Sequence, residues 1–408
     1  MTIIKAFGVG FCKCNEVVDK IVEKTTFRHT STDQIVSEAA ILSDMKVAKV
    51  QKALTYKTSV FEKFTHEKKY ALAHIKLVLS KMLMISAGRD LILTGYSTQL
   101  IPKDITHFFR VGLIADMEFR VATLMEQEKI SKANAEQQIK KLDEEQAKWM
   151  AKYCGVYEAF NPADYDLIIP MNTESIDDAA QLIIQHQQDD IFQPTGSSTQ
   201  AVADFNLAAR AEVALTKKGH DVVVTAGRGD ITIKIDKEVS RFDHLKNELT
   251  SILEKVDGVN GIEIKKEENL PGHEAYRKYD KNMPSRILLV DDEQDFVKTL
   301  SERLALRDMG SAVVHDGESA LRLIKQDEPD VMVLDLKMPG QNGIDVLKEV
   351  KKSYPGIEII ILTGHGSEED KQQCLELGAF DYLHKPLDIT KLSEVIKKAN
   401  EKVNQQAE

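Results

Sequence analysis

Three acidic residues in the last third of the chain stand where a parallel β-sheet would bring them together. Asp291 and Asp292 directly follow the apolar run ILLV (287–290), and Asp335 directly follows VMVL (331–334). The carboxyl ends of parallel strands meet at one edge of a sheet. Neighbouring carboxylates repel one another and raise one another's pKa unless a cation lies between them. Mg²⁺ prefers such oxygen ligands, so the sequence predicts a magnesium site at this edge.

Two more side chains with useful chemistry fall at the same edge. Thr363 follows the apolar run IIIL (359–362), and Lys385 follows DYLH (381–384). A lysine and a hydroxyl beside an acidic metal site could hold an anionic group that arrives on one of the carboxylates. This set of residues therefore predicts a site that forms an aspartyl phosphate.

The segment from residue 285 to 408 has the alternation that positions such a site. Short apolar runs alternate with helix-like stretches, which is typical of a doubly wound, flavodoxin-like parallel sheet. The expected strands are 287–290, 312–314, 331–334, 359–362 and 381–383, and the expected helices begin near 294, 317, 342, 368 and 389.

Four stretches in order resemble the receiver domain of two-component response regulators: ILLVDDE (287–293), VLDLKMPGQNG (333–343), ILTGHG (361–366) and DYLHKP (381–386). The resemblance implies that Asp335 accepts phosphate from a histidine kinase, and that Asp291, Asp292 and the Lys337 backbone carbonyl hold Mg²⁺. It further implies that Thr363 and Lys385 contact the phosphoryl group, that Tyr382 rotates on activation, and that the bond before Pro386 is cis. A degenerate receiver that accepts no phosphate is the alternative.

The beginning of the chain has the layout of a phosphate-binding loop without its residues. FGVGFCKCNEVV (7–18) joins an apolar run to a helix-like segment, and it contains Gly8 and Gly10. A working loop needs Gly-Lys followed by Ser or Thr. Here Lys13 stands where the last glycine belongs, and Cys14 follows it. The motif alone favours an ordinary turn.

The surrounding sequence resembles the cytidylate kinase-like family of nucleoside monophosphate kinases. The matching stretches are TIIKAFGVG (2–10), GRDLILTGYSTQL (88–100), 107–155 and DYDLIIPMNT (164–173). This resemblance implies a P-loop-kinase-like parallel sheet and suggests nucleotide-binding residues: Gly8, Gly10, Lys13, Arg110 and Arg120. The nucleotide would be ATP or CMP, although surface or structural pairing is the plainer role for both arginines.

The departures from the family concern the cations that transfer phosphate. Leu142 and Gln146 stand where the lid helix of the family carries arginines, and Tyr96 replaces an arginine after Gly95. Phosphoryl transfer depends on such charges. We therefore expect a kinase-like domain that has lost catalysis, with an active nucleoside monophosphate kinase gated by the receiver as the alternative.

The middle of the chain predicts a small α+β domain with a hairpin. LAARAEVAL (207–215), DVVVTAGRGDITIKI (221–235) and VDGVNGIEI (256–264) resemble a BON domain, which implies a binding module for phospholipid or protein. Polar stretches at 187–199 and 266–285 read as linkers. They divide an α/β protein into three predicted blocks: 1–187, 198–266 and 285–408.

Composition excludes several function classes. The net charge of the 408 residues is −11, and 285–408 carries 16 Lys and Arg against 24 Asp and Glu. An acidic chain without a basic recognition helix argues against nucleic acid as a partner. No apolar run approaches the ~20 residues of a membrane span. The start of the chain is strand-like and not a basic region followed by an apolar core, so we expect no signal peptide. Four cysteines make no disulfide framework, and Cys12-x-Cys14 is too sparse for zinc.

These observations predict a cytoplasmic signalling protein. Its expected partners are a histidine kinase and a downstream protein that the sequence does not name. A membrane surface would be reached only through the middle block. The sequence leaves open whether the signal passes by contact between domains or by formation of a homodimer.

Overall fold

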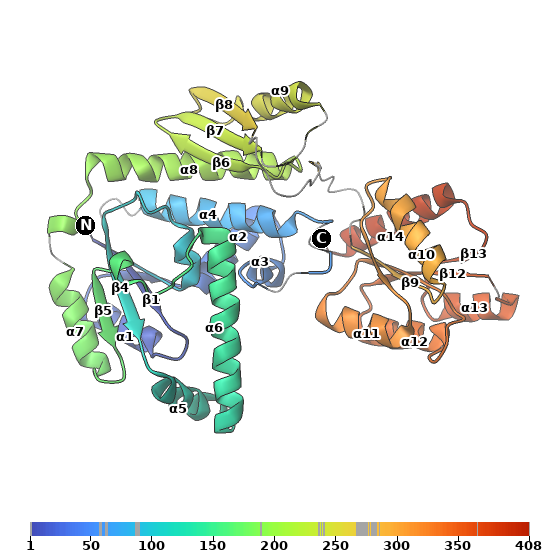
Figure 1. Cartoon of the computed structure of the whole chain (residues 1–408), viewed down its shortest axis with the longest axis horizontal. Coiled ribbons are helices and arrows are strands. Elements are labelled where there is room, and N and C mark those ends of the chain that lie inside the picture. The colour runs from blue at the N-terminus through green and yellow to red at the C-terminus, as the bar shows by residue number, and fades with distance from the viewer. Residues whose placement is uncertain are drawn as a thin grey trace. The chain divides into compact units, whose positions relative to one another are not determined.

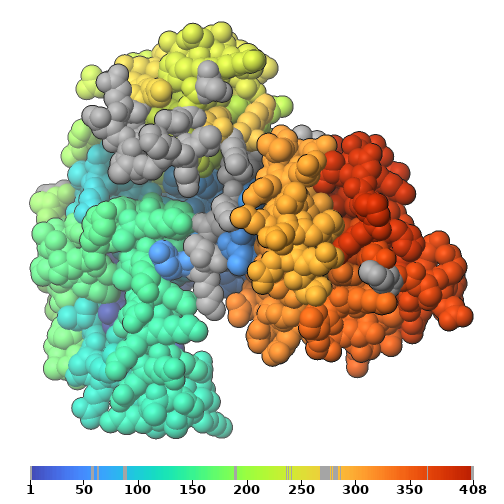
Figure 2. Space-filling view, turned by 45° about the vertical axis from the view of Figure 1, so that its right-hand side comes forward, coloured from blue at the N-terminus to red at the C-terminus, as the bar shows by residue number. Residues whose placement is uncertain are grey.

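The computed structural model describes residues 2–407 except 57–58, 62–63, 86–89, 188–189, 236, 238, 240, 267–275, 277, 279–283, 285 and 365. The chain folds into two compact units, and one of them is discontinuous in sequence. The first contains Met1–Lys57 and Glu67–Tyr276, and the second contains Thr58–His66 and Arg277–Glu408. Figure 2 shows their surfaces, coloured along the chain. Within the described residues, none of the helices has the length and apolar character needed to cross a membrane.

The first unit is built on a five-stranded parallel sheet with the order β2-β3-β1-β4-β5 (Figure 1). Helices α1 and α7 cover one face, and α2, α3 and α4 cover the other. The sheet confirms the parallel architecture expected for residues 1–187. The strands are β1 (Ile3–Gly8), β2 (Arg28–Thr30), β3 (Leu91–Thr94), β4 (Phe108–Ile114) and β5 (Leu167–Pro170).

Its helices are shorter than the sequence pattern suggests. The sequence pattern predicts one continuous helix over 37–54 and another over 118–155. They divide at Asp44 and at Lys129, because both residues have left-handed backbone with φ of 56°. A side chain of Ser131 then caps the next helix by accepting a hydrogen bond from the Asn134 amide. The helices are α1 (Cys14–Lys24), α2 (Thr32–Ser43), α3 (Val47–Ala53), α4 (Glu67–Ile85), η1 (Tyr96–Leu100), α5 (Met117–Glu128), α6 (Lys132–Cys154), η2 (Pro162–Asp164), α7 (Ile176–His186) and η3 (Asp190–Phe192).

The middle block forms a mixed three-stranded sheet, in which β6 (Val223–Gly227) and β7 (Asp230–Ile235) are antiparallel and β8 (Gly261–Lys266) runs parallel to β7. Helices α8 (Gly196–Lys217) and α9 (Phe242–Leu253) complete it. The expected hairpin and helices are present, but α8 begins inside the stretch predicted as a linker.

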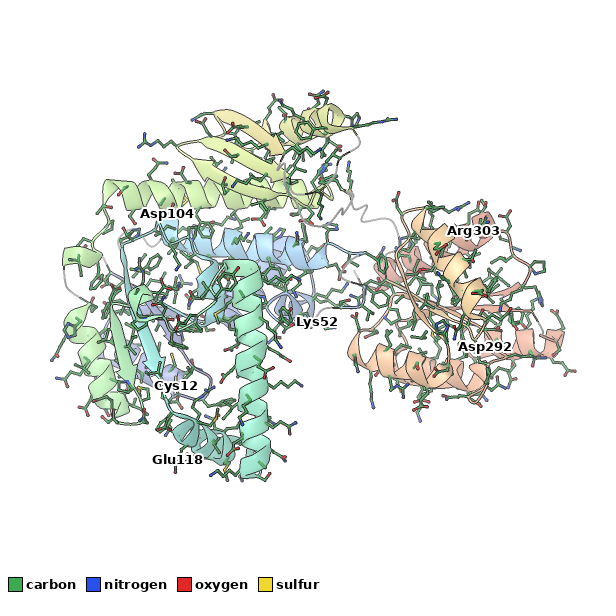
Figure 3. All side chains as sticks on the ribbon, in the orientation of Figure 1. Cys12, Lys52, Asp104, Glu118, Asp292 and Arg303 are labelled. Atoms are coloured by element: carbon green, nitrogen blue, oxygen red, sulfur yellow. The ribbon has the colours of Figure 1, made fainter. Side chains whose placement is uncertain are left out.

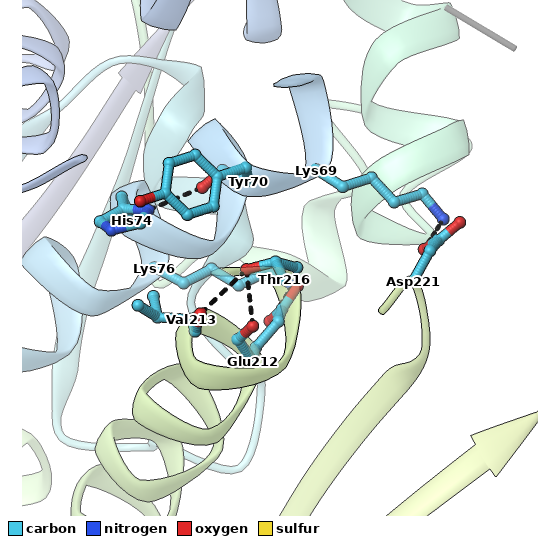
Figure 4. Close-up of polar contacts among 8 residues, drawn as sticks. All are labelled: Lys69, Tyr70, His74, Lys76, Glu212, Val213, Thr216 and Asp221. Carbon is cyan, nitrogen blue, oxygen red and sulfur yellow. Dashed lines mark hydrogen bonds and ion pairs between the residues drawn. The ribbon is translucent and has the colours of Figure 1, made fainter. Parts of the chain in front are cut away.

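Helix α8 is shared between two cores, which joins the middle block to the kinase-like sheet within the first unit. Phe205 packs in the hydrophobic core that contains α4 and the first sheet. Leu207, two residues later, packs in the core of the middle sheet. Polar contacts between α4 and the middle block reinforce the packing (Figure 4): Lys76 binds both carboxylate oxygens of Glu212 at 3.0 and 2.9 Å, and Lys69 binds Asp221.

The second unit carries a parallel sheet with the order β10-β9-β11-β12-β13, the flavodoxin-like arrangement. Helices α10 and α14 cover one face, and α11, α12 and α13 cover the other. This confirms the doubly wound fold. The elements are β9 (Ile287–Val290), α10 (Gln294–Ala305), β10 (Ser311–Val314), α11 (Gly317–Gln326), β11 (Val331–Leu334), α12 (Gly343–Ser353), β12 (Glu358–Thr363), α13 (Glu368–Glu376), β13 (Asp381–His384) and α14 (Ile389–Ala407).

Part of the core of the second unit comes from the segment between α3 and α4. Phe61 is fully buried among residues of β9, β11 and α11. The Arg286 guanidinium lies 5.4 Å from the Phe61 ring centroid and forms an ion pair with Asp327 at 3.1 Å. Ser59 donates a hydrogen bond to the same carboxylate. The sequence analysis did not foresee this segment as part of the C-terminal fold.

Candidate functional site

The acidic residues predicted from the sequence converge at the carboxyl edge of the second sheet. Oxygen atoms of Asp291, Asp292 and Asp335 all lie within 4.8 Å of one another. Asp291 and Asp335 are each 5% exposed, while Asp292 is more accessible; Figure 3 labels Asp292 at this edge. Three carboxylates at this spacing are a donor set of hard oxygen atoms with one accessible side, which fits Mg²⁺.

Lys385 holds the carboxylates together from β13. Its Nζ lies 2.8 Å from Asp291 Oδ2, 3.0 Å from Asp335 Oδ2 and 2.8 Å from Glu293 Oε1. Burial disfavours the charge of Lys385, but the hydrogen bonds to these carboxylates outweigh burial and raise the pKa of the ammonium above its usual value. Burial also raises the pKa of Asp291, and the hydrogen bond from Lys385 opposes that rise.

The sequence analysis gave no role to two residues that contact Lys385. Glu293 is the last acid of the DDE run and binds Lys385, while the Phe296 ring centroid lies 4.4 Å from Lys385 Nζ. The third acid of the run was the available signal for Glu293. The Lys337 amide donates to Asp335 Oδ1 at 3.3 Å, so Lys337 lies beside the acceptor, and its carbonyl stays a predicted metal ligand.

Thr363 is the last residue of β12, and Tyr382 is the second residue of β13. Thr363 is fully buried, and Tyr382 is 6% exposed. A Cβ on Gly366 would overlap the Tyr382 hydroxyl, so glycine is needed there while the ring points inward. Burial raises the pKa of Tyr382 to about 12, and its hydroxyl has no hydrogen-bond partner among the described residues. The Lys385-Pro386 bond is cis, as predicted.

The glycine loop after β1 is filled by the protein's own side chains. A Cβ on Gly10 would lie 2.8 Å from Leu142 Cδ2. Arg120 donates from Nε to the Gly10 carbonyl at 2.7 Å and forms two bonds to Asp143, at 2.9 and 2.6 Å. Leu142 and Asp143 belong to α6. The helix of the predicted lid thus occupies the space over the loop.

The backbone of the glycine loop has an unusual conformation at two residues. Phe11 and Lys13 have φ of 66° and 62°, a left-handed conformation that is uncommon for residues other than glycine. The Lys13 ammonium lies 5.5 Å from the Phe119 ring centroid. Around Gly8 the thiols of Cys12 and Cys14 pack closely, and burial raises the pKa of Cys12 to about 11, so this thiol is protonated at neutral pH.

Arg110 is separate from the other predicted nucleotide-binding residues. It lies within β4, where its register partner on β1 is Lys5. Together with Lys5 it lines a cavity to which Gly8, Gly10, Lys13 and Arg120 do not contribute. The structure therefore groups four of the five predicted residues at the carboxyl edge of the first sheet and places Arg110 elsewhere.

Two family models match the chain, one for each of these sites. Residues 287–397 match the response regulator receiver domain, and residues 3–173 match the cytidylate kinase-like family. Residues 287–397 are a response regulator receiver domain. The N-terminal match, together with the parallel sheet, shows a cytidylate kinase-like domain. The matches give no evidence for a BON domain, so the resemblance of residues 203–265 stays a prediction.

Two curated relatives each match about a quarter of this chain. The transcriptional regulatory protein CpxR of Klebsiella pneumoniae subsp. pneumoniae (strain HS11286) is 46% identical over 102 residues, which are 25% of this chain and 43% of that protein. The regulatory protein AtoC of Escherichia coli (strain K12) is 35% identical over 115 residues, 28% of this chain and 25% of that protein. The chain thus spans less than half the length of these relatives.

Solved receiver domains align with the same part of the chain. The response regulator receiver domain protein from Clostridium thermocellum is 32% identical, with 29% of this chain and 97% of that chain covered and a TM-score of 0.29. The receiver domain of NtrX from Brucella abortus is 31% identical, with 28% and 98% covered and a TM-score of 0.27.

Proposed function

We propose that this chain is a cytoplasmic two-component signalling protein whose receiver domain is phosphorylated on Asp335 by a histidine kinase. The observation that carries the proposal is the convergence of Asp291, Asp292 and Asp335 around Lys385. A bound Mg²⁺ would neutralise the incoming phosphoryl group and the acceptor carboxylate. Asp291, Asp292, Asp335 and the Lys337 carbonyl would hold the ion.

The chain's own residues supply the remaining steps of the switch. Lys385 lies 3.0 Å from the acceptor carboxylate and would follow the new charge of about −1.5 to −2. Thr363 at the end of β12 would donate to a phosphoryl oxygen. Its movement would vacate space beside Tyr382, whose buried hydroxyl lies against Gly366, so the β12–α13–β13 surface would change with phosphorylation.

Labelling with acetyl phosphate tests this function. We expect one phosphoryl group per chain with Mg²⁺ and none with excess chelator, measured by intact-protein mass spectrometry under mild conditions. Asp292→Ala should weaken Mg²⁺ binding, measured by calorimetric titration of the protein with Mg²⁺. Labelling that proceeds equally well without a divalent ion would exclude the proposed mechanism.

We infer that the kinase-like domain receives or relays the signal by binding a nucleotide or a partner, and does not transfer phosphate. Leu142 fills the space over Gly10, and Arg120 is held by Asp143. A cation engaged in an ion pair within the protein contributes less to a developing phosphoryl charge than one aimed at the transition state. The middle block, joined to this domain through α8, would act as a docking module for a downstream protein.

An active nucleoside monophosphate kinase gated by the receiver is the second candidate, favoured by the family match over 3–173. A coupled assay with ATP, CMP and Mg²⁺ decides between the two. We expect no turnover above that of an Arg120→Met control, with or without phosphorylation of the receiver. Turnover that disappears in Arg120→Met would establish the enzyme instead.

A further inference from the structure

A second charged cavity lies in the kinase-like domain, away from the glycine loop. Its volume is about 280 Å³. Pro102 and Lys103 come from the loop before β4, and Tyr165 comes from the segment before β5, so the cavity lies toward the amino ends of these strands. Figure 3 labels Asp104 in this loop and Cys12 in the loop after β1, at opposite ends of the sheet.

Positive charge dominates the lining of this cavity. Four cationic residues line it, against a single acidic residue, Asp164; the cations are Lys5, Lys76, Lys103 and Arg110. Lys103 is paired with Asp164 at 2.9 Å, and Lys76 with Glu212 at 2.9 Å. The charges of Lys5 and Arg110 are therefore the ones left to be balanced.

Lys5 and Arg110 are neighbours because of the strand register. They are partners on the adjacent parallel strands β1 and β4, so both side chains leave the same face of the sheet. Lys5 Nζ donates to Gln99 Oε1 at 3.0 Å, a neutral partner. No carboxylate pairs with either cation among the described residues. Two like charges in a partly buried cavity repel each other, which an anion between them would relieve.

Aromatic side chains also line the cavity. Tyr165 lines it, and its ring stacks on Phe160 with centroids 5.7 Å apart and an interplanar angle of 10°. Phe160 stacks in turn on Phe7 of β1 at 5.0 Å. The Tyr165 hydroxyl donates to the Ala159 carbonyl at 2.6 Å, so the ring is held in place at the cavity.

We propose that this cavity binds a small organic oxyanion, in which a phosphate or carboxylate group lies between Lys5 and Arg110 and a flat body lies against Tyr165. Arginine and lysine together suit such a group because the guanidinium binds two oxygens and the ammonium adds a point charge. The volume is near the lower end of known ligand pockets, so the ligand is of the size of a substituted aromatic ring. The site is independent of the receiver's acidic pocket.

Calorimetry on the full chain tests the site with two probes, phenyl phosphate and benzoate, which separate the two oxyanions. We expect at least one to bind, and Lys5→Met and Arg110→Met each to weaken that binding at least tenfold. Lys20→Met, a change at an exposed lysine on α1, should leave it unchanged. Absence of heat with both probes, or undiminished binding in both cavity variants, would overturn the proposal.

Two further readouts keep the result interpretable. If Arg120→Met abolishes binding while Lys5→Met does not, the probe lies at the glycine loop and the cavity assignment is wrong. In the unaltered protein, the bound probe should protect Lys5 from reductive methylation, mapped by peptide mass spectrometry. Equal modification of Lys5 with and without a saturating probe contradicts the site even if a variant fails to fold.

The pH dependence of benzoate binding gives an independent check. Burial, and then the charge of Arg110, lower the pKa of Lys5 to about 8; Cys154, Asp164 and Lys103 are the other groups that act on it. Burial raises the pKa of Cys154 to about 12, so this thiol stays neutral. The ammonium binds the anion, so affinity should be constant below neutral pH and fall as pH rises through the pKa of Lys5, by up to about tenfold per pH unit. A flat profile from pH 6 to pH 10 excludes Lys5 as a ligand.

Discussion

The receiver pocket and the glycine loop occupy the same place in two parallel sheets, yet they are built in opposite ways. In the receiver, Asp291, Asp292 and Asp335 lie close together at some cost in electrostatic repulsion, and Lys385 bridges Asp291 and Asp335. At the glycine loop, Arg120 forms an ion pair with Asp143, and Leu142 lies over Gly10. The carboxyl edge of a parallel sheet is a place where a site can form. Whether a site is present there depends on how the charges at that edge are paired.

This contrast indicates which of the two sites is prepared for chemistry. Like charges that lie close together repel one another, so they favour the binding of a cation or a transferable group. In a bidentate arginine–carboxylate pair, each charge is already balanced by the other within the protein. We therefore expect the kinase-like edge to contribute to stability and the receiver edge to react.

Asp335→Asn tests the reactive side of the comparison and should have the largest effect. The amide cannot accept a phosphoryl group, so labelling by acetyl phosphate should be abolished. Asp345→Asn on α12, an exposed residue, is the matched control and should label normally. Full labelling of Asp335→Asn, read from the mass of the intact protein, would mean that another carboxylate is the acceptor.

Phe61→Ala asks how far the receiver depends on a residue that precedes it by more than two hundred positions. Loss of a fully buried phenylalanine should lower the free energy of unfolding by about 3–5 kcal/mol. Val60→Ala, at a side chain that is 44% exposed, should change it little. The measurement is denaturant unfolding with hydrogen exchange of β9 and β11; equal stability of both variants would contradict a core role for Phe61.

Asp143→Asn tests the stabilising side of the comparison. Arg120 is buried and would lose its charged partner, so we expect destabilisation of about 1–3 kcal/mol. Glu144→Gln, one residue along α6 and 70% exposed, is the control. If thermal denaturation is unaffected by Asp143→Asn, the ion pair does not hold the lid helix over the loop.

Tyr382→Phe should have the smallest effect on stability. The hydroxyl is buried and has no partner among the described residues, so its removal should change the unfolding free energy by less than about 1 kcal/mol. A change in the response to phosphorylation without a change in stability would sharpen the difference between the two edges. Strong destabilisation would show that the hydroxyl makes a hydrogen bond in solution.

The receiver domain could be predicted from the sequence because its motifs are short and occur in a fixed order along the chain. Asp291, Asp335 and Thr363 stand at the ends of apolar strands, so their positions follow from the strand pattern alone. Strand β2 (Arg28–Thr30) escaped the sequence analysis because it is short and polar, and its position comes from pairing with β3. Helix α8 was expected to begin only at residue 205, but it begins at Gly196, because its first turns are rich in small polar residues that also suit a linker.

The kinase-like site was harder to predict because its state depends on contacts between distant residues. The sequence identified Leu142 as a departure, but only the packing of α6 shows that it lies over Gly10. Arg110 was grouped with Arg120 by family resemblance, and the strand register assigns it to Lys5 instead. Glu293 was missed although it belongs to a motif that was recognised, because an exposed acid beside the two predicted metal ligands carries no signal of its own.

The discontinuous composition of the second unit has a consequence for how the chain comes apart. The covalent path enters this unit at residues 58–66, leaves it, and returns near residue 277. A protease that cut only between 267 and 286 would break the backbone without removing Phe61 from the receiver core. The two fragments should therefore migrate together on a sizing column and separate only in denaturant, and a receiver excised at residue 285 would carry an empty space where an aromatic ring belongs.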